Sequence, residues 1–426
     1  MNIWLINHHA LPPTEGGGTR HYSHARELIR RGHQVEIVAC SFQHLRHEHM
    51  AISPGCVWER QICDGVPFTW IRALGYRANS LPRIINMLQF ANRVRAVGWA
   101  KGLQKPHLVL GSSPHPFAAL AAERCAARFG VPFILEIRDV WPYVLTEVGG
   151  YSERHPFIQL VDRVMRYLYR RAARIVMFSG SSTSLLARSG ADPSKIVWIP
   201  NGVDLQLYPA PSSPKDGSQF TVTYLGAHNQ WNSLDAVLDA AKLLSQDGRQ
   251  DVLFRFVGDG VDRQRLIERA RKEGIANVRF DAPVPKKQVP QLLHDSDALI
   301  INSRKDGVSK NWMSYNKIYD YLAAGRPIVF GCCASDNPVK DSGAGISVEA
   351  DNPAELARAV ALLASQPAEV RWEYGMRGRQ YVEQNYSVAK LVDRFEQLAL
   401  EVTGQARGQM RRSSRRARRW ATSESD

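Results

Sequence analysis

The sequence predicts an α/β protein built from two doubly wound domains, and three observations support this prediction. The chain has 426 residues, of which 44% are hydrophobic, so it is long enough to bury two cores. Short apolar runs alternate with segments of helical periodicity, which is the pattern of a parallel sheet with crossover helices. This alternation occurs twice, on either side of the Pro- and Ser-rich stretch Pro209–Pro214.

The first series starts with the apolar run Asn2–Asn7, which is typical of a buried strand. A Gly-rich loop at 16–18 follows, and Thr19–Arg31 then has apolar residues at helical spacing. Gly32 ends this helix and Val35–Ala39 is the next strand, so the chain begins with a βαβ unit. The other strands expected in this half are Leu108–Gly111, Phe133–Ile137, Ile175–Phe178 and Ile196–Ile199.

The second series repeats this order of elements. Its expected strands are Phe220–Leu225, Leu253–Val257, Val278–Asp281, Ala298–Asn302 and Pro327–Phe330. Its expected helices are Leu234–Leu244, Asp262–Lys272 and Val289–Leu293. We therefore expect one domain at residues 1–203 and a second at 204–385. They would face each other across a cleft, with ligands at the carboxyl ends of the strands.

The composition limits where the protein is expected to work and which kinds of site it can hold. The formal net charge is +14, from 55 basic and 41 acidic residues, which suits nucleic acid, membrane phosphate or an anionic substrate. None of the six cysteines forms a CxxC pair, so we expect reduced thiols in a cytoplasmic protein, without a zinc or disulfide framework. Met1 leads straight into a strand, so no signal peptide is expected. No apolar run approaches the length of a membrane span.

Two basic amphipathic segments, Tyr76–Lys105 and Val161–Arg174, lie outside the alternating pattern. Each alone is slightly better explained as an ordinary helix with a solvated charged face, but together they favour contact with an anionic membrane surface. The C-terminal segment 405–426 is also basic, and 404–420 holds seven Arg and no acid, so we expect a disordered tail. Such a tail would be a membrane or nucleic-acid tether, or would have no specific role.

The most informative stretch is Asn316–Gly331, which reads NKIYDYLAAGRPIVFG. It predicts a short helix that is closed by Gly325 and followed at once by a buried strand. Free amides near Asn316 and the cation of Lys317 would lie at the positive end of the helix dipole, where phosphate binds well. Asp320 lies one turn later on the same helix face, so its carboxylate could hold sugar hydroxyls. These residues suggest a nucleotide-sugar site.

Two further groups of candidate residues follow strands of the first half. Gly17 and Gly18 lie between a strand and a helix, where backbone amides can meet phosphate, although a flexible surface loop explains them equally well. Arg138 and Asp139 follow another strand, and Asp139 could hold a substrate hydroxyl, shuttle a proton or simply cap a helix. We prefer the functional interpretation because it also accounts for Arg138.

The corresponding loops of the second half supply further candidates for donor binding. Gly226, Ala227 and His228 end its first strand, and Gly258 ends the next one. A glycine at such a position allows a ligand to approach the backbone closely. The loop that contains Val284 follows a third strand and could frame a flat base. Each loop is of a common type, and only their shared position at strand ends makes them informative.

Five motifs, taken together, resemble the family 4 retaining glycosyltransferases of the GT-B fold, which has two Rossmann-like domains. These motifs are GGG after the first strand, IPNGVD between the halves, YLGA, FVGDG and YDYLAAGRPIV. The resemblance extends from about Met1 to the helix Lys390–Val402. The stretch 123–142, ERCAARFGVPFILEIRDVWP, is similar to the branch that builds bacterial surface polysaccharides, including transferases of N-acetyl-fucosamine-type sugars.

The resemblance implies roles for particular residues. Asp320 matches the second Glu of the family's Glu-x7-Glu motif, which holds the ribose hydroxyls, whereas Trp312 stands where the first Glu would be. Many relatives neutralise the diphosphate with an Arg and a Lys that are absent from 228–232 here. Lys317 is the candidate replacement.

Further implications concern both domains. Arg304 and Lys305 are second choices for the missing cations. Many relatives have a His where Arg138 precedes Asp139, and Arg can stabilise phosphate charge but is a poor proton shuttle. The family implies an acceptor-side first domain, a nucleotide-sugar-binding second domain, and a last helix that returns to the first domain, which 386–404 fits.

The implied reaction moves a hexosyl or N-acetylhexosaminyl group from a nucleoside-diphosphate sugar, with a UDP-sugar favoured, and retains the anomeric configuration. Amides near Gly17, the helix start at Asn316 and Lys317 would stabilise the leaving diphosphate, so no metal or other cofactor is expected. Asp139 and Arg138 complete the expected catalytic group. The expected acceptor is a lipid-linked saccharide at the inner membrane face, with no nucleic acid as partner.

The sequence leaves three alternatives open. A non-catalytic relative that acts as an assembly partner would explain the missing basic pair. A nucleotide-sugar 2-epimerase of the same fold would need two acid/base groups, for which only Asp139 and Glu136 are available. A nucleic-acid-binding protein would explain the Arg-rich tail, but it would not explain the Gly loops at strand ends.

Overall fold

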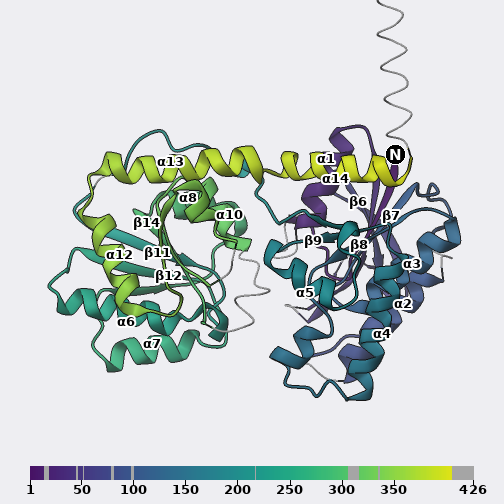
Figure 1. The fold of residues 1–426 in the computed structure, drawn as a ribbon, viewed down its shortest axis with the longest axis horizontal. Coiled ribbons are helices and arrows are strands. Elements are labelled where there is room, and N and C mark those ends of the chain that lie inside the picture. The colour runs from purple at the N-terminus through teal and green to yellow at the C-terminus, as the bar shows by residue number, and fades with distance from the viewer. Residues whose placement is uncertain are drawn as a thin grey trace, which may run out of the picture. The chain divides into compact units, whose positions relative to one another are not determined.

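The computed structural model of the chain describes residues 1–13, 19–44, 47–50, 52–77, 81–96, 100–215, 217–305, 316–333 and 336–404. Contacts between these residues divide the chain into two compact units. Unit 1 comprises Met1–Phe178, Thr183–Ile199 and the residues from Leu391 onward, and unit 2 comprises Ser179–Ser182 and Pro200–Lys390. Each unit is a sheet covered by helices (Figure 1). The assignment of the two domains to acceptor and donor stays a prediction.

Unit 1 contains an eight-stranded sheet in the order β10-β9-β8-β7-β1-β2-β6-β5. Its strands are β1 (Asn2–Ile6), β2 (Gln34–Cys40), β5 (Trp58–Cys63), β6 (Val66–Ile71), β7 (Leu108–Ser112), β8 (Phe133–Ile137), β9 (Arg174–Met177) and β10 (Ile196–Trp198). All neighbours run parallel except β5 and β6. β1, β7 and β8 are buried along their whole length, because helices cover both faces of a parallel sheet.

The hairpin of β5 and β6 was not predicted from the sequence. Asp64 and Gly65 join the two strands, with φ angles of 47° and 79°. Positive φ at both central residues suits the right-handed twist of the strands, and Asp-Gly is a preferred pair for such a turn. The Asp-Gly pair that signals this hairpin was therefore present in the sequence. A separate small sheet pairs β3 (Phe42–Gln43) with β4 (Glu48–His49).

Helices cover both faces of the unit 1 sheet. They are α1 (Arg20–Arg30), α2 (Leu81–Arg95), α3 (Pro116–Phe129), α4 (Pro156–Arg171), α5 (Thr183–Arg188) and, from Leu391, α14 (Val388–Val402). Figure 1 shows α2, α3 and α4 grouped on one side of the sheet and α1 on the other. Arg31, just after α1, forms an ion pair with Asp393 of α14 at 2.7 Å. Residues of α14 thus lie beside the end of α1.

The two basic segments of the sequence analysis correspond to α2 and α4, with different bounds. α2 is shorter than the predicted segment Tyr76–Lys105, and α4 begins at Pro156, five residues before the predicted start at Val161. His155 caps α4, because its ring nitrogen accepts a hydrogen bond from the Phe157 amide at 3.2 Å. No helix in the described ranges is long and apolar enough to cross a membrane. The predicted basic tail, 405–426, lies outside the described residues.

Unit 2 contains a six-stranded parallel sheet in the order β13-β12-β11-β14-β15-β16. Its strands are β11 (Phe220–Leu225), β12 (Val252–Val257), β13 (Val278–Asp281), β14 (Ala298–Asn302), β15 (Ile328–Gly331) and β16 (Gly345–Val348). The predicted bounds of β11, β13 and β14 agree with the structure. The short edge strand β16 was not predicted.

Two sets of helices pack on this second sheet. They are α6 (Leu234–Gln246), α7 (Arg263–Lys272), α8 (Val289–His294), α10 (Asn316–Ala323), α11 (Pro338–Ser342), α12 (Pro353–Ser365) and α13 (Ala368–Asn385). α6, α7 and α12 lie on one side of the sheet, and α8, α10 and α13 lie on the other (Figure 1). The core beneath α6 and α12 is apolar and includes Val222, Leu238, Phe254, Ile300 and Val360.

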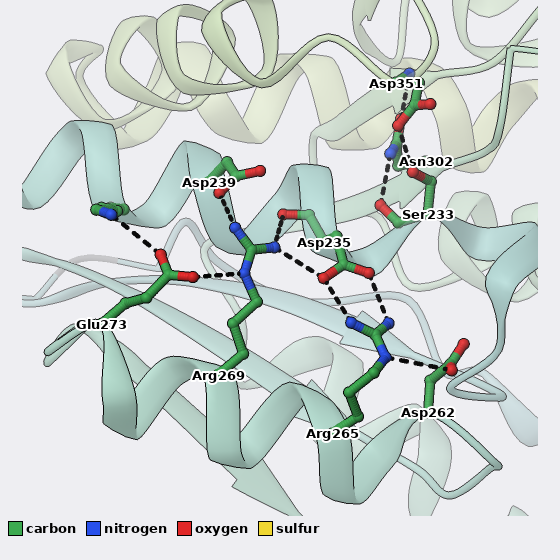
Figure 2. Close-up of polar contacts among 10 residues, drawn as sticks. Ser233, Asp235, Asp239, Asp262, Arg265, Arg269, Glu273, Asn302 and Asp351 are labelled. Atoms are coloured by element: carbon green, nitrogen blue, oxygen red, sulfur yellow. Dashed lines mark hydrogen bonds and ion pairs between the residues drawn. The ribbon is translucent and has the colours of Figure 1, made fainter.

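A network of ion pairs fixes α7 on α6 (Figure 2). Arg265 contacts Asp235 at 2.6 Å, and Arg269 contacts the same carboxylate at 2.8 Å. Arg269 also pairs with Asp239, and with Glu273 at 2.8 Å. These side chains are partly exposed, so solvent screening keeps the contribution of each pair to stability small. Together these contacts link the exposed faces of α6 and α7.

Candidate functional site

The carboxyl ends of β11 and β12 come into unusually close contact at two glycines. Gly226 has φ 151° and Gly258 has φ 141°, a region that favours glycine. A Cβ atom at Gly258 would lie 2.0 Å from the Gly226 carbonyl oxygen, so no side chain fits there. A Cβ atom at Gly226 would lie 2.8 Å from Nζ of Lys317. The glycines therefore allow a lysine of α10 to reach the end of the central strand.

Lys317 is a cation without a carboxylate partner in the described part of the chain. Its Nζ donates to Oη of Tyr224 at 2.9 Å and to Oδ1 of Asn232 at 3.0 Å. It also lies 4.2 Å from the centre of the Tyr224 ring. Burial lowers the pKa of Lys317 to about 7. A partly desolvated ammonium held only by neutral groups is well suited to bind an anion.

The position of Lys317 bears directly on the missing basic pair. The residues expected to carry that pair in relatives, 228–232, form the loop after β11, and Asn232 of this loop holds the Lys317 ammonium. A lysine from α10 thus reaches the loop that lacks its own cation. Lys305, a second choice in the sequence analysis, instead forms an ion pair with Glu349. Arg304 lies 5.8 Å from the centre of the Trp231 ring.

Asp320 lies one helical turn after Lys317 in α10. Its Oδ1 accepts a hydrogen bond from Oη of Tyr208 at 2.8 Å. Burial raises the pKa of Asp320, although Lys286 and the Tyr208 hydroxyl oppose this rise. In the described residues Oδ2 of Asp320 accepts no hydrogen bond, so one carboxylate oxygen can still receive a ligand hydroxyl. Tyr208 was not predicted as a site residue, because 112 residues separate it from Asp320.

His228 is enclosed by protein rather than open to solvent. Its relative exposure is 0%, and in the described residues neither ring nitrogen has a hydrogen-bond partner. Its ring lies 5.9 Å from that of Tyr224 and 6.2 Å from that of Phe280. Burial first, and then Arg263 and Lys317, lower the pKa of His228 to about 4, so the ring is neutral. The donor-binding role of its side chain stays a prediction.

The other predicted donor residues are located as follows. Ala227 directs its carbonyl oxygen toward Oη of Tyr224 at 2.7 Å and Nδ2 of Asn232 at 2.9 Å. Val284 is half-buried in the loop between β13 and α8. Asn316 begins α10 and is exposed. Gly17, Gly18 and Trp312 lie outside the described residues.

In unit 1, Arg138 and Asp139 follow β8 directly. The Arg138 guanidinium lies 4.2 Å from the centre of the Phe178 ring, and burial lowers the pKa of Arg138 to about 10. Burial also raises the pKa of Asp139 to about 6, although Arg138 and Arg83 oppose this rise. A carboxyl that titrates near neutrality can act as a proton acceptor or donor. The catalytic roles of both residues stay predictions.

Glu136, two residues earlier, belongs to a buried ionic network that the sequence analysis did not identify. Its carboxylate contacts Nε of Arg20 at 3.0 Å and Nε2 of His21 at 2.7 Å. Burial opposes ionisation, but His21 and Arg20 hold the pKa of Glu136 well below its usual range. Both partners belong to α1, more than 100 residues away. Glu136 therefore joins α1 to β8 and is not a free acid/base group.

Several histidines gather at the ends of β1 and β7. Nε2 of His115 lies 3.0 Å from Nδ1 of His8, and the ring of His9 lies 4.6 Å from that of His8. Burial keeps the pKa of all three below its ordinary value, and that of His9 falls to about 3. In the described ranges no group of three or more His, Cys, Asp or Glu is arranged to hold a metal ion. This cluster of neutral rings lies at the same sheet edge as Asp139.

Two family models match the chain, one in each half. The Glycosyl transferase 4-like domain matches residues 15–202, and Glycosyl transferases group 1 matches residues 219–366. The two sheets and these matches together define a glycosyltransferase of the GT-B fold. More particularly, the chain belongs to the glycosyltransferases that combine a Glycosyl transferase 4-like domain in the first half with a Glycosyl transferases group 1 domain in the second.

Curated relatives are distant. The chain is 21% identical over 277 residues to "Probable glycosyltransferase WbjE" of Pseudomonas aeruginosa, which covers 62% of this chain and 67% of that protein. It is 19% identical over 239 residues to "Uncharacterized glycosyltransferase MJ1069" of Methanocaldococcus jannaschii, which covers 55% of this chain and 59% of that protein. The N-acetyl-fucosamine-type branch stays a prediction.

Solved structures share the fold over nearly the whole chain. Anabaena HepE in complex with UDP and glucose has a TM-score of 0.64 at 14% identity, and covers 93% of this chain and 98% of that one. WaaG, a glycosyltransferase involved in lipopolysaccharide biosynthesis, has a TM-score of 0.64 at 15% identity, and the match covers 95% of this chain and 100% of that one. Sucrose-phosphate synthase of Thermosynechococcus elongatus has a TM-score of 0.71 at 15% identity, and the match covers 95% of this chain and 99% of that one. At these identities the likeness shows the fold alone.

Proposed function

We propose that this glycosyltransferase takes a sugar from a nucleoside-diphosphate sugar, with a UDP-sugar favoured, and retains its anomeric configuration. The observation that carries the proposal is the Lys317 ammonium at the end of β11, which neutral groups hold and no described carboxylate neutralises. The Anabaena HepE structures contain UDP and UDP-glucose, which supports a uridine donor for a chain of the same fold.

The donor would bind to unit 2 in two parts. Lys317 would neutralise the diphosphate as a point charge, and amides near Asn316 would add the positive end of the α10 dipole. Asp320 would accept hydrogen bonds from the ribose hydroxyls, with its second oxygen kept in place by Tyr208. Gly226 and Gly258 would allow the nucleotide close to the backbone. The half-buried side chain of Val284 would pack on the base.

The chemical step would depend mainly on stabilising the leaving group. As the bond between the anomeric carbon and the phosphate oxygen breaks, negative charge grows on the diphosphate, and Lys317 would stabilise it. The acceptor oxygen would attack from the same face and give its proton to the departing phosphate. Asp139 would orient a hydroxyl, and Arg138 would add positive charge. We propose that no metal ion is needed.

The epimerase alternative is weaker than the transferase. Such an enzyme needs two groups that exchange protons with the sugar. Glu136 is fixed between Arg20 and His21 and stays ionised, so it does not supply the second group.

We propose a lipid-linked saccharide as acceptor, with the enzyme at an anionic membrane surface. Leu81, Ile85 and Leu88 of α2 are 67%, 37% and 46% exposed and share one face of the helix. The exposed side chains of Arg163 and Arg170 on α4 add positive charge on the same side of the sheet. Exposed apolar residues with cations are typical of interfacial helices.

A turnover assay tests the proposed transfer. Purified protein is incubated with a panel of UDP- and GDP-sugars and a bacterial membrane lipid extract, and the release of nucleoside diphosphate is measured. We expect release with at least one donor, and a loss of tenfold or more in Asp139→Asn, Lys317→Ala and Asp320→Ala. Release that survives all three changes would contradict the site assignment. The absence of release and of binding with every donor would favour the non-catalytic assembly partner.

A further inference from the structure

The Asn232 side chain determines where the Lys317 ammonium lies. Its Nδ2 donates to the Ala227 carbonyl oxygen at 2.9 Å and to Oδ1 of Asn229 at 2.8 Å. These two bonds turn its Oδ1 toward Lys317, which donates to it at 3.0 Å. The position of the cation therefore depends on the conformation of the loop 226–233 between β11 and α6.

This loop ends in a backbone conformation that needs support from its surroundings. Ser233, directly after Asn232, has φ 40° and ψ 54°, which is the left-handed region. A residue with a Cβ atom adopts this region only where neighbouring groups hold it. Asp351, which follows β16, has φ 59° and accepts a hydrogen bond from the Ser233 hydroxyl. Two left-handed residues from distant parts of unit 2 thus lie side by side.

Asn302 connects these two residues (Figure 2). It is the last residue of β14, and its relative exposure is 0%. Its Nδ2 donates to the Ser233 carbonyl oxygen at 2.9 Å, and its Oδ1 accepts from the Asp351 amide at 3.2 Å. Gly331, its neighbour in β15, leaves room for it, because a Cβ atom there would lie 2.6 Å from Oδ1 of Asn302.

We propose that Asn302 is a positioning residue for the donor diphosphate, because it fixes the left-handed turn at Ser233 and so holds Asn232 against the Lys317 ammonium. Its amide can donate to one of these backbone groups and accept from the other at the same time. The proposal rests on the proposed donor-binding role of Lys317. The geometry that it describes, however, exists without a ligand and can be tested without one.

The consequence for Lys317 is measurable in the protein alone. When Asn302 no longer holds the turn, the loop 226–233 relaxes and water reaches the ammonium. Solvation favours the charged form, so the pKa of Lys317 rises from about 7 toward its ordinary value. A purely structural role of Asn302 would change the stability of the protein but would leave this pKa unchanged.

The experiment is an NMR titration of protein carrying ¹³Cε-labelled lysine, in which the Lys317 signal is assigned by its absence in Lys317→Ala. We expect Lys317 to titrate near pH 7 in the wild type and at least one unit higher in Asn302→Ala, which introduces no charge. Asn302→Ser, which is too short to reach both backbone groups, is a second variant and should shift the pKa in the same direction. An unchanged pKa of Lys317 in a folded Asn302 variant would overturn the proposal.

Asn277→Ala is the matched control. Asn277 is also a buried Asn of unit 2 whose Nδ2 donates to a backbone carbonyl, that of Ala241, at 2.9 Å. Its removal should lower stability and leave the Lys317 titration unchanged. An equal shift in this control would also contradict a specific role of Asn302.

Affinity for UDP gives the second readout. If the wild type binds UDP, Asn302→Ala should weaken binding by about tenfold at pH 6, and Asn277→Ala should not. A wild type that binds no nucleoside diphosphate would refute the proposed donor site, while the NMR titration would still decide whether Asn302 positions Lys317.

Discussion

At the scale of single residues, burial sets the charge state of the main candidate groups. Lys317 and Asp139 lie in different units, yet burial moves the pKa of each toward neutrality, to about 7 and about 6. In the part of the chain that the structure describes, neither group forms a close ion pair, whereas Arg20 and His21 keep Glu136 ionised. Perturbed groups of this kind are commoner at functional sites than elsewhere.

Asp139 gives a prediction that separates function from stability. Its pKa in the folded protein, about 6, lies above the unfolded value of about 3.9, so at neutral pH the ionised form is disfavoured on folding. Asp139→Asn removes that cost and should raise the free energy of unfolding at pH 8 by about 1–3 kcal/mol, with a smaller gain at pH 5. The same variant should lose transfer activity. Urea denaturation at the two pH values measures the stability, and a lower stability at pH 8 would be inconsistent with this account.

The activity of the wild type should follow the ionisation of the same carboxyl. If ionised Asp139 orients a hydroxyl, kcat/KM should fall as the pH falls through about 6. A pH–rate profile of nucleoside diphosphate release measures this fall. A profile that stays flat down to pH 5 would rule out an ionised Asp139 in the reaction.

His228 gives a prediction about an enclosed imidazole. Because its ring is buried between aromatic rings and has no hydrogen-bond partner in the described residues, His228→Phe should change stability by less than about 1 kcal/mol. His228→Ala should lower stability by about 3 kcal/mol, since it leaves a cavity. Thermal unfolding measures both. If His228→Phe keeps its stability but binds UDP more than tenfold less tightly, the imidazole contributes to donor binding.

At the scale of elements, the alternation of apolar runs predicted most of the parallel sheets. β11, β13 and β14 have the bounds expected from their sequences. β14 is buried along its whole length and is a nearly continuous apolar run, whereas the edge strand β13 alternates apolar and polar residues. The β5–β6 hairpin was missed although Asp64-Gly65 is a turn signal. The edge strand β5 alternates exposed and partly exposed residues and has no buried one, so its sequence resembles a loop.

The exposed apolar face of α2 gives a prediction about membrane binding. Leu88→Asp places a charge in the exposed apolar stripe and should weaken binding to anionic phospholipid vesicles by about tenfold, because the lost burial of a Leu is worth about 1.5–3 kcal/mol. Leu362→Asp is the control, since Leu362 of α12 is a similarly exposed Leu of unit 2, at 52% against 46% for Leu88. Co-sedimentation with anionic and neutral vesicles measures the binding. Equal binding of Leu88→Asp and the wild type would exclude α2 as the docking helix.

At the scale of the whole molecule, each of the two Rossmann-like units carries its own group of candidate residues. The motifs directed attention to the loops that hold these candidates, because ligands bind at the carboxyl ends of parallel strands. They did not predict the contacts that these residues make. Lys317 meets Asn232 across 85 residues, and Tyr208 meets Asp320 across 112, so each contact depends on how distant segments pack. The replacement of a missing loop cation by a lysine of α10 could be suggested from the sequence, but its hydrogen bonds could not.

The most direct test of the account is the dissociation constant of UDP for the wild type and for two Lys317 variants, measured calorimetrically at pH 6 and pH 8.5. We expect Lys317→Ala to weaken binding at pH 6 by about tenfold or more, since a hydrogen bond to a charged group is worth about 1.5–3 kcal/mol. Wild-type binding should weaken as Lys317 loses its proton above pH 7, and Lys317→Arg, which stays charged, should lose this part of the pH dependence. Equal affinity of the wild type and Lys317→Ala at pH 6 would contradict a donor site built around Lys317.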